Sequence, residues 1–282
     1  MKILVTGARG MLGTDLVPVL QEEHDVIGVD IGDFDLVSPR AIGQIVHIAP
    51  EVVLNLAAFT DVDGCETKIE QAYAGNALAV RNVALACQRC QAVLLHISTD
   101  YVFDGEKDGA YYEWDHPNPL SAYGRTKLAG EHFVQHLLDR FYIVRTAWLY
   151  GSHGKNFVDT ILATADSKKE LSVVDDQRGS PTYTTDLARA LARIVPSGFY
   201  GVYHVTNGGA CSWYEFAKKI LALAGKTDAS LKATDSQTYM RPARRPKNSL
   251  LHNYVWRMTF GDPLRHWEEG LRDYLKETGR VV

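Results

Sequence analysis

The stretch Gly7-Ala8-Arg9-Gly10-Met11-Leu12-Gly13 decides the fold because of what stands on either side of it. The apolar run Lys2–Thr6 comes before it and predicts a buried strand, and the pattern at residues 11–21 predicts a helix. Glycines here let the backbone turn tightly, approach a phosphate closely and pack the helix on the strand. The first glycine step is one residue longer than in the commonest dinucleotide fingerprint, but its setting still predicts a pyrophosphate site.

Apolar runs of strand length alternate with helical patterns through the first half of the chain, which indicates βαβ units and a parallel sheet. Further strands are expected at residues 24–30, 52–57, 92–98 and 141–148, and helices at residues 39–47, 77–90 and 121–138. Shorter elements follow: helices at 156–165, 185–194, 212–224 and 263–277, strands at 171–174 and 201–205, and a proline-containing loop at 241–247.

The predicted fold class is therefore α/β, a Rossmann-type doubly wound parallel sheet with a smaller, partly interleaved C-terminal substrate lobe. Residues 1–150 form the expected dinucleotide-binding domain. Residues 151–282 form mainly the substrate lobe, with some segments returning to the Rossmann domain.

Composition narrows the class of partner. The chain has 282 residues, 46% of them hydrophobic, and a formal charge of −4, so neither nucleic acid nor anionic lipid is an expected partner. No apolar stretch reaches the ~20 residues that span a bilayer, and the N-terminal run is too short for a signal peptide. Four scattered cysteines fit a reducing compartment. We expect a cytoplasmic protein that binds a small molecule and does not bind a membrane.

Two residues pull the choice of cofactor in opposite directions. Asp30 ends the second strand, where an acidic side chain accepts hydrogen bonds from the ribose hydroxyls of NAD. Arg9, inside the glycine loop, would pair with the 2′-phosphate of NADP. We therefore expect either NADH or NADPH to be used. A loop-capping aspartate and a solvated arginine are the alternatives that the sequence leaves open.

Tyr123-Gly124-Arg125-Thr126-Lys127 places a phenol and an ammonium on one face of a predicted helix. A phenol with a pKa of ~10 donates a proton poorly at neutral pH unless a nearby cation stabilises its anion. Tyr123 would protonate a carbonyl oxygen while hydride reaches the carbon, and Thr99, at the end of the fourth strand, would bond the same oxygen. This arrangement predicts a carbonyl reductase.

Together these motifs resemble the extended short-chain dehydrogenase/reductases. The segments at residues 98–105, 123–131, 144–151, 176–182, 203–217 and 244–249 are similar to those of dTDP-4-dehydrorhamnose reductases. The resemblance implies reduction of the 4-keto group of dTDP-4-dehydro-6-deoxy-L-mannose to dTDP-L-rhamnose for cell-surface polysaccharide. It implies a dTDP-linked 4-keto sugar as partner, a monomer or homodimer, and Mg²⁺, for which the sequence offers no ligand cluster. Ser121 departs from the asparagine often found there, but serine still caps a helix.

The expected site has three parts. The catalytic set is Tyr123, Lys127 and Thr99. The cofactor set is Gly7, Arg9, Gly10, Met11, Leu12, Gly13, Asp30, Asp35, Leu36, Ala57, Ala58, Phe59, Asn76, Ser98, Tyr123 and Lys127. The substrate set is Thr99, Asp100, Tyr101, Trp148, Asn156, Gln177, Thr182, Arg241 and Arg245, and no metal ligands are assigned.

Several alternatives stay open at this point. Trp148 would also suit a plain core position, and Arg241 and Arg245 a solvated loop. A nucleotide-sugar epimerase or dehydratase with tightly bound NAD would share the glycine loop and the tyrosine-lysine pair. A dinucleotide-binding regulatory subunit without catalysis would share the fold.

Overall fold

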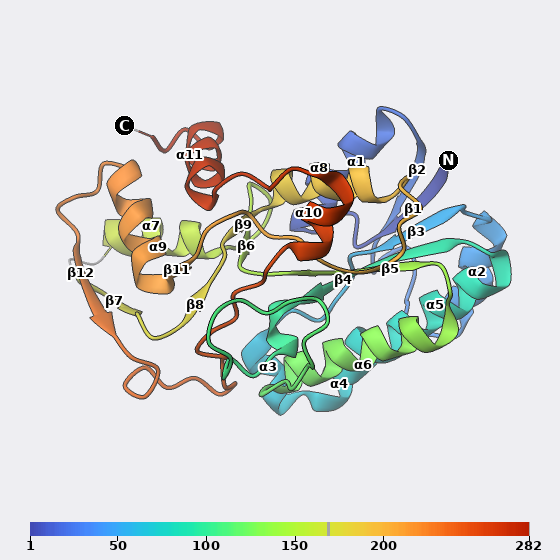
Figure 1. Cartoon of the computed structure of the whole chain (residues 1–282), viewed down its shortest axis with the longest axis horizontal. Helices are drawn as coiled ribbons and strands as arrows, with labels where there is room; N and C mark the ends of the chain where they lie inside the picture. The colour runs from blue at the N-terminus through green and yellow to red at the C-terminus, as the bar shows by residue number, and fades with distance from the viewer. Residues whose placement is uncertain (168–169, 282) are drawn as a thin grey trace.

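A six-stranded parallel sheet forms the centre of the computed structural model, which describes residues 1–167 and 170–281 (Figure 1). The strands lie in the order β2-β1-β3-β4-β5-β10. Their bounds are β1 (Lys2–Thr6), β2 (Asp25–Val29), β3 (Val52–Asn55), β4 (Val93–Thr99), β5 (Phe141–Thr146) and β10 (Gly201–His204). The chain runs from β1 out to β2 and then returns to β3 on the other side of β1, so a crevice is expected where these strands end.

Helices cover both faces of this sheet, as the unbroken apolar runs predict (Figure 1). One face carries α1 (Met11–Gln21), α8 (Thr184–Ile194) and α10 (Tyr254–Phe260), which pack Leu16, Leu191 and Trp256 into one core. The opposite face carries α2 (Arg40–Ile48), α5 (Ala79–Cys90) and α6 (Ala122–Leu137) over a second core. The predicted doubly wound fold is confirmed.

A smaller lobe has its own aromatic core, in which Tyr150, Phe216 and Trp267 are buried. Its helices are α7 (Phe157–Ser167), α9 (Trp213–Leu223) and α11 (Trp267–Glu277). Short strand pairs complete it: β6 (Leu149–Tyr150) with β9 (Thr182–Tyr183), β7 (Glu170–Val174) with β12 (Ser230–Thr234), and β8 (Arg178–Gly179) with β11 (Cys211–Ser212). Between these pieces the chain returns to the large sheet as α8 and β10.

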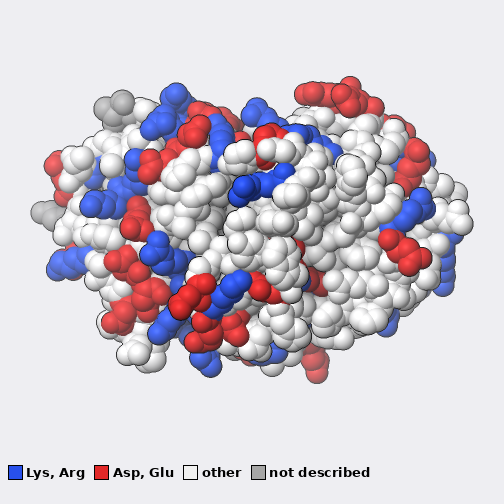
Figure 2. Space-filling view, in the orientation of Figure 1, with Lys and Arg blue, Asp and Glu red and all other residues white. Residues whose placement is uncertain are grey.

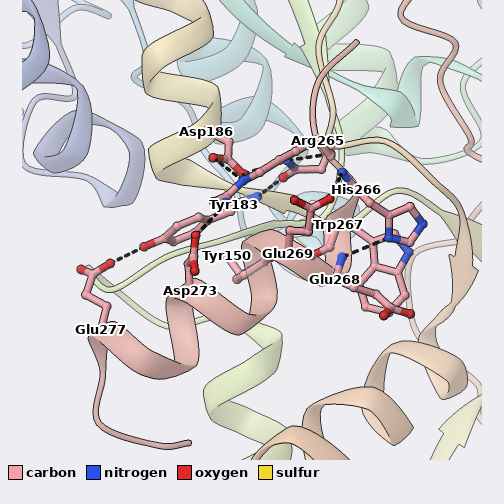
Figure 3. A network of polar contacts seen from close by, with 11 residues as sticks. Tyr150, Tyr183, Asp186, Arg265, His266, Trp267, Glu268, Glu269, Asp273 and Glu277 are labelled. Carbon is pink, nitrogen blue, oxygen red and sulfur yellow. Dashed lines mark hydrogen bonds and ion pairs between the residues drawn. The ribbon is translucent and has the colours of Figure 1, made fainter.

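A polar network ties the C-terminal helix to the helices of the large sheet (Figure 3). The guanidinium of Arg265 donates to both oxygens of Asp186 in α8, at 3.0 and 2.8 Å, and to Asp273 in α11 at 2.5 Å. Tyr183 donates its hydroxyl to Glu277 at the end of α11. Since Asp186 is buried, these bonds fix the angle at which α11 meets α8.

Local departures from the expected elements have identifiable causes. The strand expected at residues 141–148 ends at Thr146, because Trp148 has a left-handed φ of 49° that a strand does not allow. The helix expected at residues 263–277 begins only at Trp267, after the extended residue His266 caps it. Two short helices, α3 (Val62–Thr67) and α4 (Ile69–Tyr73), were not expected. A π-turn, η1 (Ala74–Leu78), stands where residues 77–78 were expected to be α-helical.

Charge is mixed on the visible face of the molecule: Figure 2 shows acidic and basic side chains interspersed over the smaller lobe, with a broad uncharged area beside it. No helix within the described ranges is long and apolar enough to cross a bilayer.

Candidate active site

The glycine loop is pressed against the end of β3, where the strand order reverses. Gly7 has a left-handed φ of 72°, and a Cβ there would lie 2.8 Å from the amide nitrogen of Ala57. A Cβ on Gly13 would lie 2.4 Å from the carbonyl oxygen of Gly7. Gly10 precedes α1, and no side chain caps that helix. The first amides of α1 therefore face the loop without a side-chain hydrogen-bond partner. Since a side chain at Gly7 or Gly13 would collide with backbone, glycine keeps the loop tight, and the resulting cradle at the start of α1 fits the diphosphate of a dinucleotide.

Asparagines shape the two loops beside this cradle. Asn76, in the π-turn η1, accepts from the amide of Phe59 at 2.8 Å and donates to its carbonyl at 3.1 Å. Asn82 donates to the carbonyl of Leu36 at 3.0 Å, which fixes the loop that also holds Asp35. Both asparagine side chains are buried, and each holds the backbone next to residues that were expected to bind the cofactor. Ala57 and Ala58 follow β3 after one intervening residue, Leu56.

The end of β2 carries a charged cluster that sequence reasoning found only in part. The amide of Arg9 donates to Asp30 at 2.9 Å, so Asp30 and Arg9 do lie together. The guanidinium of Arg9, however, is paired with Asp33 at 2.6 Å. Asp33 was not among the expected site residues, although it lies only three positions after Asp30.

Helix α6 is built to bring Tyr123 close to the end of β4. Ser121 accepts a hydrogen bond from the amide of Gly124 at 3.1 Å, which confirms that this serine caps the helix. A Cβ at Gly124 would lie 2.1 Å from the carbonyl oxygen of Tyr101, so only glycine lets α6 approach this closely. The rings of Tyr101 and Tyr123 then meet edge to face at 5.9 Å.

Protonation in the site differs from the expectation. Burial raises the pKa of Tyr123, and a hydrogen bond with Thr99 acts against that rise. Burial lowers the pKa of Lys127 to about 8, while Glu131 acts in the opposite direction. The ammonium of Lys127 donates to the carbonyl of Ile97 at 2.6 Å. The expected lowering of the phenol's pKa by Lys127 is therefore wrong for this structure, because desolvation outweighs any such effect.

The carboxyl ends of β4 and β5 bring together a polar group beside Tyr123. Thr99 donates to Asp100 at 3.0 Å, and Thr99 lies opposite Thr146 in the register of the two strands. Burial raises the pKa of Asp100 to about 7, against hydrogen bonds from Ser249 and Thr99. Among the described side chains, Oδ2 of Asp100 and Oγ1 of Thr146 are buried without a hydrogen-bond partner. Buried polar atoms usually have a partner, so these two are candidates for bonding a substrate, and Thr146 was not expected from the sequence.

Behind the reacting residues lies a buried ion pair that the sequence did not reveal. Glu131 and Arg145 have side chains only 1% and 4% exposed, and their closest atoms are 2.7 Å apart. Ser98, which was expected to contact the cofactor, donates its hydroxyl to Glu131 at 2.5 Å. The pair thereby connects α6, β4 and β5 just below Lys127. The sequence did carry one signal of this pair: Arg145 is a charged residue within an apolar strand, and such residues are rarely buried without a partner.

The expected substrate residues of the smaller lobe are largely engaged by the protein. Trp148 stacks on Trp213 with ring centres 3.5 Å apart and planes at 8°. Asn156 accepts from the amide of Asp159 at 2.9 Å and so caps α7. Gln177 donates to Ser236 at 2.8 Å, and Thr182 is buried in β9. Their roles toward a substrate stay predictions.

The basic loop folds back over α3. Arg245 holds both oxygens of Asp63, at 2.7 and 3.0 Å, and its charge acts against the rise that burial causes in the pKa of Tyr101. Arg241 is half exposed and donates to Tyr239 at 3.0 Å. Asp63, a further residue that was missed, therefore anchors the loop next to Tyr101. Arg241 is the more accessible of the two arginines for a substrate diphosphate.

Magnesium has no evident place in this site. Within residues 1–167 and 170–281, no group of three or more His, Cys, Asp or Glu side chains could hold a metal ion. No residues are therefore assigned to the Mg²⁺ that the resemblance implies, and no step of the chemistry is assigned to it.

Comparison with known proteins now identifies the family. The model of the RmlD substrate binding domain family matches residues 1–280. The chain belongs to this family. The spore coat polysaccharide biosynthesis protein SpsK of Bacillus subtilis is 41% identical, with 98% of this chain and 97% of that protein covered. A dTDP-4-dehydrorhamnose reductase structure from Clostridium acetobutylicum is 44% identical, with a TM-score of 0.96 and 99% and 100% of the two chains covered.

A second member of the family has been solved with a dinucleotide. The dTDP-4-dehydrorhamnose reductase of Bacillus anthracis, in complex with NADP, is 39% identical, with a TM-score of 0.93 and 98% and 99% of the two chains covered. The resemblance drawn from residues 98–105 and 123–131 is thus confirmed at the level of the family.

Proposed function

We propose that this chain reduces the 4-keto group of dTDP-4-dehydro-6-deoxy-L-mannose to dTDP-L-rhamnose, using NADH or NADPH. The observation that carries the proposal is the placement of Tyr123, Thr99 and Asp100 together at the carboxyl end of β4. That edge of the sheet also holds the glycine loop. Family membership over nearly the whole chain supports the same activity.

The chemistry divides between cofactor and protein. When bound, the reduced nicotinamide supplies hydride to the carbonyl carbon. Tyr123 donates its phenolic proton to the carbonyl oxygen, so that negative charge does not build up there. Burial raises the pKa of Tyr123, so at neutral pH the phenol holds the proton that this step requires.

The neighbours of Tyr123 orient the sugar. Thr99 and the unpartnered atoms of Asp100 and Thr146 offer hydrogen bonds around the reacting oxygen and the adjacent hydroxyl. Lys127, held by the carbonyl of Ile97, keeps a cation next to the site while it is protonated.

The test is to supply dTDP-4-dehydro-6-deoxy-L-mannose with NADH or NADPH and to follow the loss of the reduced nicotinamide absorbance. Tyr123→Phe should lower turnover by at least ~100-fold with dinucleotide affinity nearly unchanged, because only the proton is deleted. Tyr200→Phe, at a tyrosine 41% exposed, is the matched control and should turn over normally. Near-normal turnover by Tyr123→Phe would refute the assignment.

A further inference from the structure

We propose that Asp63 is a positioning residue for the sugar nucleotide. From helix α3 it holds the crossing segment, residues 243–250, at the distance from Tyr123 that the substrate requires. The inference rests on the proposed function, because it concerns affinity for that substrate. It also gives Arg245 a role other than direct contact with the substrate, since Asp63 already occupies its guanidinium.

One end of the crossing segment is fixed on Asp63. The guanidinium of Arg245 donates to both oxygens of that carboxylate, at 2.7 and 3.0 Å, and the amide of Ala243 donates to its Oδ1 at 3.1 Å. The hydrogen bonds from Arg245 hold the pKa of Asp63 below its usual range, so the carboxylate is charged at neutral pH. The side chains of Arg245 and Asp63 are only 18% and 27% exposed, so this anchor is a partly buried, bidentate ion pair.

The rest of the crossing segment lies between the large sheet and the smaller lobe. A Cβ on Gly105, in the loop after β4, would lie 2.7 Å from the amide nitrogen of Lys247. On the other side, the amide of Arg178 in β8 donates to the carbonyl of Lys247, and the amide of Ser249 donates to the carbonyl of Arg178, both at 2.8 Å. Ser249 is buried next to Asp100, whose pKa it acts to lower. The segment therefore passes along the polar group at the carboxyl end of β4.

Helix α3 connects this anchor to the proton donor. Glu66, one turn after Asp63, accepts from the amide of Ala122, the first residue of α6, at 2.7 Å. Cys65 of α3 is buried in a small core against which Tyr123 packs. Asp63 therefore holds the crossing segment, while Glu66 holds the start of the helix that carries Tyr123. The distance between these two walls of the site depends on α3.

Loss of the Asp63 carboxylate should therefore affect substrate binding more than chemistry. Asp63→Asn leaves the guanidinium of Arg245 without its counter-charge, so the crossing segment loses its fixed end. Tyr123 and the glycine loop keep their own contacts, so a substrate that does bind should still react.

The experiment measures steady-state kinetics of the full chain with dTDP-4-dehydro-6-deoxy-L-mannose and NADH or NADPH. Asp63→Asn should raise KM for the sugar nucleotide by about tenfold and change kcat by less than about threefold. Asp63→Glu keeps the charge and should recover most of the loss. Adding Arg245→Gln to Asp63→Asn should raise KM by no more than about twofold further, because the two residues act through one interaction. Asp262→Asn, which breaks an exposed bidentate pair with Arg193, is the matched control and should leave KM unchanged.

Hydrogen exchange gives a second readout. The amides of residues 243–250 should exchange faster in Asp63→Asn, and those of the glycine loop should not change. An unchanged KM, a loss confined to kcat, or unchanged exchange of the crossing segment overturns the role of Asp63 while the proposed function stands. Absence of turnover in the unaltered chain would overturn both. Should Asp63→Asn fail to fold, Arg245→Gln removes the same pair from its other side and must show the same rise in KM.

Discussion

Glu131→Gln tests whether the buried ion pair below Lys127 holds the site together. Arg145 donates to Glu131 at 2.7, 3.0 and 3.3 Å, and neither side chain is more than 4% exposed. Glutamine has nearly the same shape, so the main change is the loss of the negative charge. The guanidinium is then buried without a counter-charge, which costs about 3–5 kcal/mol of unfolding free energy.

Denaturant unfolding followed by circular dichroism measures that cost. The single variant Arg145→Leu should lose a similar amount, because it leaves Glu131 buried and unpaired. The double variant Glu131→Leu/Arg145→Leu should lose at least about 2 kcal/mol less than the sum of the single variants, since no unpaired charge remains. Asp262→Asn, which breaks the exposed Arg193 pair, should cost no more than about 1 kcal/mol.

The reasoning fails if Glu131→Gln costs less than about 1 kcal/mol, or if the single losses add without coupling. A functional effect should accompany the loss of stability. Ser98 bonds Glu131, and Lys127 lies one helical turn before it, so turnover should fall even where the variant is fully folded.

Three further predictions concern protonation and the glycine loop. If activity needs the Lys127 cation, kcat/KM should fall as the pH rises through about 8, and a profile flat to about pH 10 would contradict that. Because the folded pKa of Asp100 is about 7 against an ordinary 3.8, the folded state binds the extra proton and unfolding free energy falls as pH rises across that window. Asp100→Asn should therefore raise the unfolding free energy at pH 8 and lower turnover. A variant less stable than the unaltered chain would contradict the inference that the buried charge of Asp100 is destabilising. Gly13→Ala should abolish dinucleotide binding, because its Cβ would lie 2.4 Å from a backbone oxygen, and normal calorimetric affinity would disprove the tight loop.

Local patterns predicted the fold well where they extended over whole elements. The glycine loop and the apolar runs at residues 2–6 and 52–57 predicted a parallel sheet, because a strand buried on both faces leaves no alternation. The π-turn at residues 74–78 and the left-handed Trp148 were not predictable, since tertiary contacts impose them on residues that would otherwise continue a regular element.

The residues of the candidate site could be predicted only where a fixed spacing in the sequence brings their side chains together. Tyr123 and Lys127 share a helix face, which their four-residue spacing predicts. Asp33, Asp63 and Glu131 pair with arginines that lie far from them in the sequence. Such pairs produce no regular spacing from which they could be predicted. The pKa of Tyr123 was misjudged because burial depends on the packing of α6 against β4, which no single segment encodes.

The position of β10 next to β5 limits how this protein can be divided. A polypeptide ending near residue 150 would lack β10 and would expose the hydrogen-bonding edge of β5, whose Tyr142, Ile143 and Val144 are fully buried in the complete chain. Such an edge is a template for aggregation. Exchange of the smaller lobe alone between relatives would therefore have to leave the segment with α8 and β10 in place, because a single crossover near that codon would also replace this strand of the large sheet.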